Sequence, residues 1–511
     1  MTQYVIGIDI GTQSTKSVIF DTEGNLVGEA SQATALFTPR PDWVEQDPEE
    51  LYQSAVGTVR RAVLESGIDP KDVKGISLDA QIPATVRIDE DWNPLGPVES
   101  YLDTRTKVQR DAMMNSYGKL ILDSNGIYPY VAPKLVWWKE EHPKEYERTY
   151  KALILNTYVG GRLAGLKGDE AYVDPTHMGV YGWADIRTFG WSEDLASKLG
   201  IDIEKSPRPV LPTDIIGELT PQAAQESGLV PGIPIAAGLG DAIAGWLGIG
   251  AVEPGIMVDT SGTANHVGIC ADRYEPDLEN GVLTYYPSAI PGHWFPVGYT
   301  AGTGRSHSWF IDELCLRERD GNEDRDQIYA ALEEAAKTIS PGSEGLIFSP
   351  HFGSRVCPDQ PSIRVFWLGL TWKHTRAHLY RSVLESIAFE YYVYLKVARS
   401  LFPDLQQKRM IVVGGGAKSP LWTQIKADVL GVPHATCANR SDFAPLGSAI
   451  VAGHAVGLFS DMAETAKRFT EITEDVLPRP AHSQAYHAYA EFYAKLYEQI
   501  EPIFEDLSLL Q

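Results

Sequence analysis

Residues 6–16 read IGIDIGTQSTK, an apolar, β-branched run that ends in an aspartate, a glycine and a cluster of hydroxyl groups. A second apolar run, SVIFD at residues 17–21, follows directly and leads into the turn-forming EGN of residues 23–25. This pattern predicts a strand, a tight turn, a second strand and a further turn. Glycine lets the backbone approach a ligand, and several N–H and O–H donors converge there. Such a pocket suits a phosphate chain, and Asp9 could hold Mg²⁺ beside it, directly or through water.

The same pattern returns in the second half of the chain. Residues 255–265 read GIMVDTSGTAN, which is again an apolar strand, an aspartate and a Gly-Thr turn. The next residues, HVGIC at 266–270, supply the expected return strand. One such hairpin is equally well explained by an ordinary β-turn whose hydroxyls face solvent. Two of them, one in each half, indicate two similar domains that face one nucleotide.

The length and the order of elements indicate how the chain is divided. A chain of 511 residues is too long for one hydrophobic core, so two large domains are expected. We place the boundary after residue 245, which gives an N-terminal domain of residues 1–245 and a C-terminal domain of residues 246–511. Residues 245–255 are rich in small side chains, with Pro254 near the end, and are the expected hinge. Alternating strands and helices predict an α/β protein.

Composition excludes several classes of partner. The formal net charge of −24 argues against nucleic acid or an anionic membrane as a partner. No run reaches the ~18 apolar residues of a membrane span, and no secretory leader is expected. The four cysteines are widely scattered, without metal-ligand spacing or a disulfide framework. This usage fits a reducing cytosol, so a cytoplasmic location is expected. Neither a Walker A motif nor a G-x-G-x-x-G motif is present.

Several further elements are predicted from local signals. Helices are expected over about residues 49–66 and 375–401, and a buried strand at residues 75–79. Residues 410–416 are expected to form a strand and a glycine-rich turn before a helix that starts near residue 421. An amphipathic helix from about residue 482 to residue 500 is expected to end at Pro502.

Five segments together carry a resemblance to one enzyme family. They are GIDIGT at residues 7–12, GLGDA at 238–242, DTSGT at 259–263, GL at 369–370 with HL and SVLE within 378–385, and GGGAKSPLW at 414–422. Their types and order resemble the FGGY family of carbohydrate kinases, within the actin/Hsp70/sugar-kinase superfamily. The resemblance spans nearly the whole chain. It implies two ribonuclease H-like (actin-like ATPase) domains with an interdomain cleft, and ATP and Mg²⁺ as cofactors. Dimers are common in that family, so a homodimer is compatible with the resemblance, but the sequence does not give the oligomeric state.

The resemblance also implies roles for particular residues. Asp241 matches the catalytic aspartate, which would take the proton from a sugar hydroxyl and also contact the sugar. The other matches are the phosphate contacts Thr12, Gln13, Ser14, Lys16, Gly262, Thr263 and Gly304, the adenosine contacts Gly415, Gly416 and Ser419, the sugar contacts Gln81 and Asp103, and the metal ligand Asp9.

Ordinary structural explanations stand beside these roles. From the residues alone, Asp241 is equally well explained as a helix N-cap. Lys16 could be a solvated strand lysine, and the glycines at 414–416 a strained turn between a strand and a helix. Arg105 is expected to pair with a neighbouring carboxylate rather than with a ligand.

The motifs constrain the identity of the sugar less than they constrain the family. WVEQD at residues 43–47, APKL at 132–135 and GAKSP at 416–420 are similar to the xylulokinase branch of the family. That branch carries Gly-Gln-Met-His-Gly where this chain has Ala80-Gln81-Ile82-Pro83-Ala84, so the Met-His pair is replaced. Glycerol kinases carry Arg-Glu at the same pair, so glycerol is not expected either.

The first expectation is therefore ATP-dependent phosphorylation of D-xylulose to D-xylulose 5-phosphate. An FGGY kinase for another ketose or for a sugar alcohol stays open, because the Ile82-Pro83 pair is altered. A non-catalytic sensor of sugar or nucleotide and an actin-like assembling ATPase are further alternatives. The presence of both Asp9 and Asp241 weighs against the sensor, and the adenosine and sugar segments weigh against the polymer.

Overall fold

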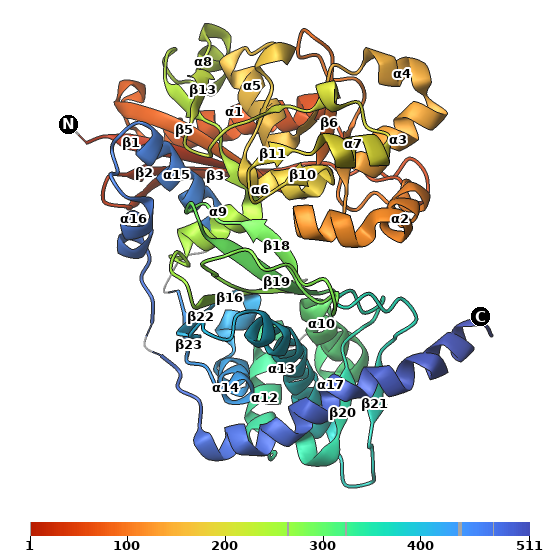
Figure 1. Ribbon diagram of the computed structural model, residues 1–511. Helices are drawn as coiled ribbons and strands as arrows, with labels where there is room; N and C mark the ends of the chain where they lie inside the picture. The colour runs from red at the N-terminus through yellow and green to blue at the C-terminus, as the bar shows by residue number, and fades with distance from the viewer. Residues whose placement is uncertain (1, 263–264, 322–323, 438–441, 474, 511) are drawn as a thin grey trace.

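The computed structural model describes residues 2–510 except 263–264, 322–323, 438–441 and 474, and it has two α/β domains, one above the other in Figure 1. The upper domain is built on a seven-stranded sheet. Its order is β13 (Ile215–Glu218), β14 (Pro234–Ala236), β5 (Val73–Ala80), β1 (Tyr4–Ile10), β2 (Ser14–Asp21) and β3 (Leu26–Ala33), and β15 (Leu239–Gly240) also pairs with β5.

The lower domain repeats the central part of this arrangement. Its six-stranded sheet has the order β18 (Thr284–Pro287), β19 (Trp294–Thr300), β17 (Asn265–Ile269), β16 (Ile256–Ser261), β22 (Arg409–Gly414) and β23 (His434–Thr436). In each domain the first strand is antiparallel to the second and parallel to a later one: β1 with β2 and β5, and β16 with β17 and β22. Both predicted hairpins are therefore confirmed, and so is the α/β class.

Helices cover the two sheets and a smaller four-stranded sheet. That sheet is formed by β4 (Glu45–Gln46), β7 (Val98–Glu99), β6 (Thr85–Ile88) and β8 (Lys151–Ile154). The helices of the first half are α1 (Pro48–Ser66), α2 (Lys107–Asn125), α3 (Val131–Glu141), α4 (Pro143–Arg148), α5 (Leu155–Ala164), α6 (Pro175–Met178), α7 (Glu193–Leu199), α8 (Pro221–Ser227) and α9 (Asp241–Gly248). Those of the second half are α10 (Thr303–Leu314), α11 (Leu316–Asp320), α12 (Arg325–Lys337), α13 (Arg376–Leu401), α14 (Pro420–Leu430), α15 (Phe443–Ala455), α16 (Met462–Phe469) and α17 (Pro480–Ser508).

Local signals located the four predicted helices, which are α1, α13, α14 and α17. The predicted helices at 49–66 and 375–401 are α1 and α13. Helix α1 starts after the N-cap Asp47, whose side chain accepts a hydrogen bond from Glu49 N, and it ends at Gly67. The prediction that Pro502 ends the last helix was wrong, because α17 continues to Ser508. One proline removes a single backbone donor, and a helix can pass through it.

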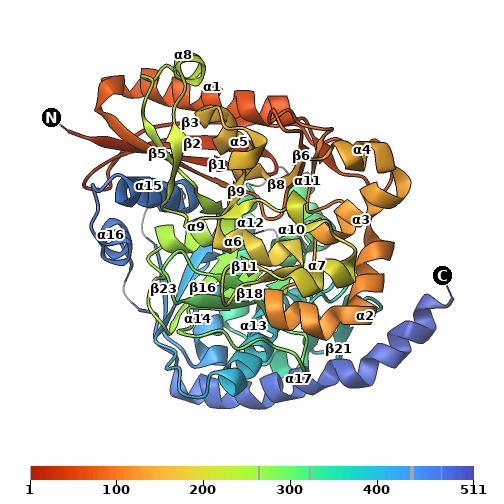
Figure 2. The same cartoon turned by 45° about the horizontal axis from the view of Figure 1, so that its top comes forward.

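Helix α15 comes from the second half of the chain but packs on the first sheet. Figures 1 and 2 both show α15, in blue, beside the red strands β1 and β2. The fit is close, since a Cβ atom on Gly7 would lie 1.8 Å from the backbone oxygen of Pro445. The upper domain therefore contains residues on both sides of the proposed boundary at 245/246, which itself stays a prediction.

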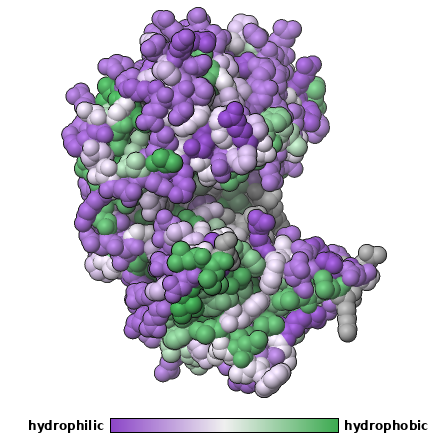
Figure 3. Space-filling view, turned by 90° about the vertical axis from the view of Figure 1, so that its right-hand side faces the viewer, coloured by the Kyte–Doolittle hydropathy of each residue, from purple (hydrophilic) through white to green (hydrophobic). Residues whose placement is uncertain are grey.

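A hollow lies between the two domains. The molecule narrows between the domains and is hollowed there in the space-filling view (Figure 3). The chain passes between them after α9, through residues 249–255. These residues are part of the expected hinge at 245–255, whose first four residues lie in α9. Among the described residues, no helix combines the length and apolar character that a membrane span requires.

Candidate active site

The turn between β1 and β2 offers polar groups to the space beside the first sheet. Gly11 N–H donates to Ser14 O (3.0 Å), which closes the turn. Gln13 and Ser14 are exposed at its tip, and Thr12 is partly buried. The structure therefore brings three of the predicted phosphate contacts together in one turn. Their contact with phosphate stays a prediction.

The register of the sheet brings charged groups to the end of β1. Asp9 lies opposite Lys16 on the antiparallel strand β2 and opposite Asp79 on the parallel strand β5. Residues paired in this way point to the same face of a sheet. The hairpin thus creates a cluster of two carboxyl groups and one ammonium group directly below the turn.

Burial and mutual repulsion raise the pKa values of the carboxyl groups in this cluster. Burial raises the pKa of Asp9 to about 6, although a hydrogen bond with Asp79 and the charge of Lys16 both lower it. Burial and the charge of Asp9 raise the pKa of Asp79 well above its usual range. The Ser448 hydroxyl donates to Asp79 Oδ2 (2.5 Å). Asp9 and Asp79 lie opposite each other on β1 and β5, so the charge of either one disfavours ionisation of the other.

Asp241 is the first residue of α9, and it lies beside this pair. The helix N-cap is Gly240, so the explanation of Asp241 as the N-cap was wrong. Its Oδ1 accepts a hydrogen bond from Ala242 N–H (2.7 Å). Burial, followed by the charge of Asp9, raises the pKa of Asp241 to about 7. A carboxylate with this pKa can accept a proton near neutral pH, as general base catalysis requires.

Lys16 is held by two acidic side chains rather than standing free. Its Nζ lies 2.7 Å from Glu29 Oε2 and also pairs with Asp442, next to the start of α15. Burial lowers the pKa of Lys16, but the hydrogen bonds to Asp442 and Glu29 outweigh this and raise it. The side chain is therefore a permanent cation beside the turn, oriented from both halves of the chain, and the solvated-lysine explanation is wrong.

The second hairpin has a different electrostatic character from the first. Asp259 occupies the position of Asp9 but is fully buried and paired with Lys426. The Tyr391 hydroxyl also donates to Asp259 Oδ1 (2.8 Å). Asp259 is thus neutralised inside the domain, whereas Asp9 has carboxyl neighbours. Gly262 is exposed in the turn, and Thr263 lies outside the described residues.

The predicted adenosine contacts lie where β22 passes into α14. Gly415 and Gly416 form a single 3₁₀ turn, and Ser419 caps α14 by accepting a hydrogen bond from Trp422 N (3.1 Å). A Cβ atom on Gly416 would lie 2.5 Å from the Cβ atom of Ser261, so this turn packs directly on the second hairpin. Gly416 therefore has a packing reason to be glycine. Gly414 has a φ of +86°, as the alternative of a strained turn between strand and helix predicts.

Two further groups lie near this turn. Gly304 is in the first turn of α10, directly after Thr303. Glu333 on α12 has its pKa raised by burial, although hydrogen bonds from Ser419 and from Leu421 N–H lower it. An acidic side chain therefore faces the predicted adenosine segment, and nothing in the sequence pattern had indicated it.

The two predicted sugar contacts have different surroundings. Gln81 is buried at the end of β5 and accepts a hydrogen bond from the Thr12 hydroxyl (3.0 Å). Its Nε2 donates to Gln46 Oε1 (2.6 Å). Gln81 therefore connects the phosphate turn with β4, and its contact with sugar stays a prediction.

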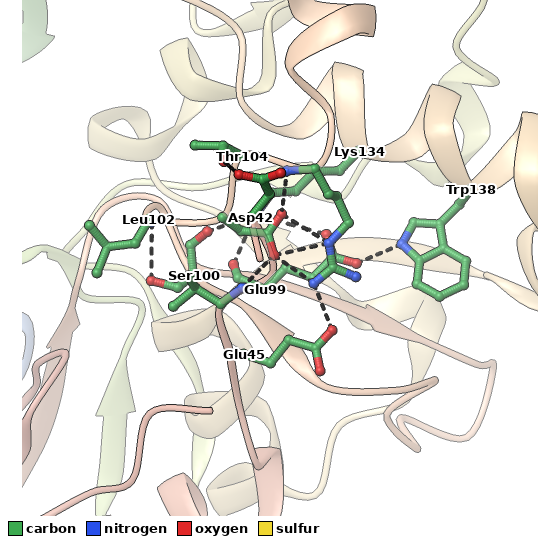
Figure 4. Close-up of polar contacts among 11 residues, drawn as sticks. Asp42, Glu45, Glu99, Ser100, Leu102, Thr104, Lys134 and Trp138 are labelled. Carbon is green, nitrogen blue, oxygen red and sulfur yellow. Dashed lines mark hydrogen bonds and ion pairs between the residues drawn. The ribbon is translucent and has the colours of Figure 1, made fainter. Parts of the chain in front are cut away.

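Asp103 forms an ion pair with Arg105, which also pairs with Glu45. Figure 4 shows polar contacts of this region, with Glu45, Glu99 and Trp138 among the labelled residues. Arg105 Nε donates to both carboxylate oxygens of Asp103, each at 2.9 Å, and Val44 N–H donates to Oδ2 (2.8 Å). Arg105 also reaches Glu45 Oε1 (2.6 Å) and lies 3.7 Å from the ring centroid of Trp43. The expected pairing of Arg105 with a carboxylate is confirmed. The Asp103 side chain has no exposed surface, so a sugar contact there, which stays a prediction, would require rearrangement.

Comparison with known proteins identifies the family. A model of the FGGY family of carbohydrate kinases, N-terminal domain, matches residues 4–248, and a model of the C-terminal domain of that family matches residues 257–456. The chain belongs to the FGGY family of carbohydrate kinases. It is accordingly a kinase that transfers a phosphoryl group to an alcohol group of a carbohydrate, with two actin-like ATPase domains.

Relatives of this FGGY kinase carry more than one name. A xylulose kinase of Bacillus subtilis (strain 168) is 27% identical over 499 residues, which is 97% of each chain. A gluconokinase of Bacillus licheniformis is also 27% identical, over 99% of this chain and 96% of its own. The crystal structure of xylulose kinase from Rhodospirillum rubrum superimposes with a TM-score of 0.87 at 25% identity, covering 98% of this chain and 100% of that one.

Besides Glu333, three residues of the kinase site are not predicted by the sequence: Asp79, Asp442 and Lys426. The sequence predicts Asp79 only as part of a buried strand, although an aspartate near the end of an apolar strand and close to Gln81 is a usable signal. Asp442 and Lys426 contact the two hairpins from positions more than 160 residues away in the chain. No local pattern announces such long-range partners.

Proposed function

We propose that this kinase phosphorylates a neutral sugar at the expense of ATP, with D-xylulose as the first-ranked substrate and D-xylulose 5-phosphate as the product. The observation that carries the proposal is Asp241, a carboxyl group with a pKa raised to about 7 beside the phosphate turn of the first hairpin. Relatives named xylulose kinase support the choice of sugar. The runner-up is a kinase for another ketose or for a sugar alcohol, and a non-catalytic sensor is the least favoured alternative.

Asp241 acts as the general base in the proposed mechanism. A sugar hydroxyl is a weak nucleophile at neutral pH, and it must lie in line with the γ-phosphorus. Asp241 accepts the hydroxyl proton as the oxygen bonds to phosphorus, and ADP leaves from the opposite side. The hydrogen bond from Ala242 N–H to Oδ1 fixes the orientation of the carboxylate.

The two hairpins bind the nucleotide from opposite sides. The turn residues Thr12 to Ser14 and the exposed Gly262 offer donors to the phosphates, and Lys16 supplies positive charge. Gly415, Gly416 and Ser419 would accommodate the adenosine, next to the carboxylate of Glu333. Because Lys16 is oriented by Asp442, its position depends on α15 staying docked on the first sheet.

The residues present fit a magnesium ion of the usual kinase type. No group of three His, Cys, Asp or Glu side chains within the described part of the chain forms a ready-made metal cage. Magnesium, however, keeps several waters and is commonly held by one or two carboxylates together with substrate phosphates. Asp9, with Asp79 beside it, is a donor of this kind at the end of β1. The ion would neutralise charge on the β- and γ-phosphates during transfer.

The charge around Asp241 favours a neutral sugar over a sugar acid. Asp9, Asp79 and Asp241 together form an acidic environment, and Arg105 is engaged by Asp103 and Glu45. A carboxylate on the substrate would be repelled there, since like charges at close range are unfavourable. This argues against gluconate, although relatives named gluconokinase match equally well.

Four free thiols support the proposed cytoplasmic location. Cys270, Cys315 and Cys357 are buried and Cys437 is partly buried, and none is in a disulfide. Free thiols are the rule in a reducing compartment.

The function is tested by an ADP-release assay across D-xylulose, D-ribulose, other ketoses, aldoses, sugar alcohols, glycerol and gluconate. The expected order is D-xylulose first, then other ketopentoses, then sugar alcohols. A panel in which glycerol or gluconate has the highest kcat/KM would contradict the ranking. A panel with no active sugar would favour the sensor.

A further inference from the structure

The short helix α6 ties a buried histidine to the residue that precedes Asp241. His177 is fully buried, and its Nδ1 lies 2.5 Å from Oδ2 of Asp174, the N-cap of α6. The neighbouring residue Thr176 also belongs to α6, and its Oγ1 accepts a hydrogen bond from Gly240 N–H (2.9 Å). Helix α6 also contacts β18 of the lower domain, so this histidine lies where the two domains meet.

The second ring nitrogen of His177 is aimed at the space beside Asp241. Nε2 is buried and has no hydrogen-bond partner among the residues that the structure describes. A Cβ atom on Gly240 would lie 3.4 Å from this Nε2 and 2.0 Å from Cδ1 of Ile82. The imidazole, Ile82 and Asp241 therefore meet around Gly240.

The unpaired Nε2 of His177 is energetically unfavourable. Buried polar groups are nearly always hydrogen-bonded, and an unsatisfied one is unfavourable. Asp174 accepts from Nδ1–H and thereby fixes the tautomer, so Nε2 carries a lone pair that can accept a hydrogen bond. The loop that faces it, Ile82 and Pro83, offers no side-chain hydrogen-bonding group. A sugar hydroxyl would satisfy Nε2.

We propose that His177 accepts a hydrogen bond from a sugar hydroxyl adjacent to the one that Asp241 deprotonates, and that it thereby sets sugar specificity. Ile82 is only partly buried and covers Gly240. A change in its side-chain rotamer opens Nε2 to the substrate, and such changes are fast compared with turnover. Pockets that hydrogen-bond a hydroxyl reject analogues that lack it, because the buried partner is then left unpaired. This inference rests on the proposed sugar kinase function.

Two substitutions separate the two ends of the imidazole. His177→Asn keeps an amide near the position of Nδ1, so the link to Asp174 can persist, but it removes the end that faces the sugar. His177→Gln places an amide near the position of Nε2. The control is His434→Asn, because His434 is also fully buried with an unpartnered Nε2 but lies on β23 of the lower domain.

The experiment measures KM and kcat for the best sugar of the panel, for ATP, and for each mono-deoxy analogue of that sugar. We expect His177→Asn to raise the sugar KM about tenfold, to leave the ATP KM unchanged, and to abolish the wild-type penalty against one mono-deoxy analogue. His177→Gln should retain part of that penalty, and His434→Asn should retain all of it. Sugar binding by calorimetry without ATP should weaken to match.

Three results would contradict the proposal or the function on which it rests, and the measurements distinguish them. An unchanged sugar KM and an unchanged analogue penalty in folded His177→Asn would overturn the proposal. So would a fall in kcat in both His177 variants that is equal for every sugar and leaves KM unchanged, because the histidine would then act only through Asp241. A wild-type protein that is inactive on every sugar would instead overturn the proposed function, and this inference with it.

Discussion

Replacing Asp241 with asparagine should separate activity from stability. The amide oxygen of asparagine can keep the hydrogen bond from Ala242 N–H, so the fold should tolerate the change. The variant cannot accept a proton, and loss of a general base lowers turnover by ~10²–10⁴-fold. At the same time it removes a buried carboxyl group next to Asp9, which the folded protein ionises only with difficulty.

The magnitude follows from the pKa of Asp241, which burial and then the charge of Asp9 raise from 3.8 to about 7. Each pKa unit corresponds to about 1.4 kcal/mol, so ionising this group costs the folded state up to about 4 kcal/mol. The folded pKa exceeds the unfolded one, so the contribution of this carboxyl to stability is complete below pH 4 and is lost as the pH rises to about 7. Stability gained by Asp241→Asn should therefore be greater at pH 8 than at pH 5, by roughly 2–3 kcal/mol.

The assay compares urea unfolding of the wild type and of Asp241→Asn at both pH values, together with turnover on the best sugar. Asp194→Asn is the control, because this carboxylate is exposed on α7. We expect the control to show no difference between the two pH values. Turnover of Asp241→Asn within a few-fold of wild type would refute the general base. Equal stability changes at pH 5 and pH 8 would refute the account of the buried charge.

Three other predictions concern motion and charge. The domains should close over ATP and sugar by bending near residues 245–254. Small-angle scattering should therefore give a smaller radius of gyration with sugar and a non-hydrolysable ATP analogue than without ligands. An unchanged scattering profile at saturating ligand would count against closure. Lys16→Met should raise the KM for ATP by about tenfold while sugar binding without nucleotide persists, and equal weakening of both would show that Lys16 is not a phosphate contact. Asp103→Ala should leave Arg105 buried without its main partner and lower the free energy of unfolding by about 3–5 kcal/mol, as measured in urea. It should also reduce sugar phosphorylation more than sugar-independent ATP hydrolysis. Unchanged stability together with unchanged sugar phosphorylation would contradict both roles of Asp103.

Sequence predicted the elements whose signals are local. The turn at Gly11 to Ser14, the repeat at Gly262 and the position of Asp241 after a glycine turn all depend on residues within about ten positions of one another. The position of Asp9 on β1 then follows, because β1 pairs with β2 in the hairpin and with β5 on its other side. The cluster of Asp9 and Lys16 could thus be anticipated from the register alone.

Contacts made across the whole chain could not be predicted in this way. Helix α15 packs on β1 through Gly7, and its preceding residue Asp442 orients Lys16, yet more than 400 residues separate these partners. The same limit applies to Lys426, which neutralises Asp259 and makes the two hairpins electrostatically unequal. The surroundings of Asp79 and Asp103 depend on burial. A sequence shows that these carboxylates are present, but not which of them is buried or paired.

The most direct test of the account is a crystal structure of the kinase with D-xylulose and a non-hydrolysable ATP analogue. It should place the triphosphate between the turn at Thr12 to Ser14 and the turn at Gly262. The Asp241 carboxylate should lie about 2.6–3.2 Å from the sugar hydroxyl that points at the γ-phosphate. A nucleotide bound away from the two hairpins, or a reacting hydroxyl that faces another base than Asp241, would contradict the central claim.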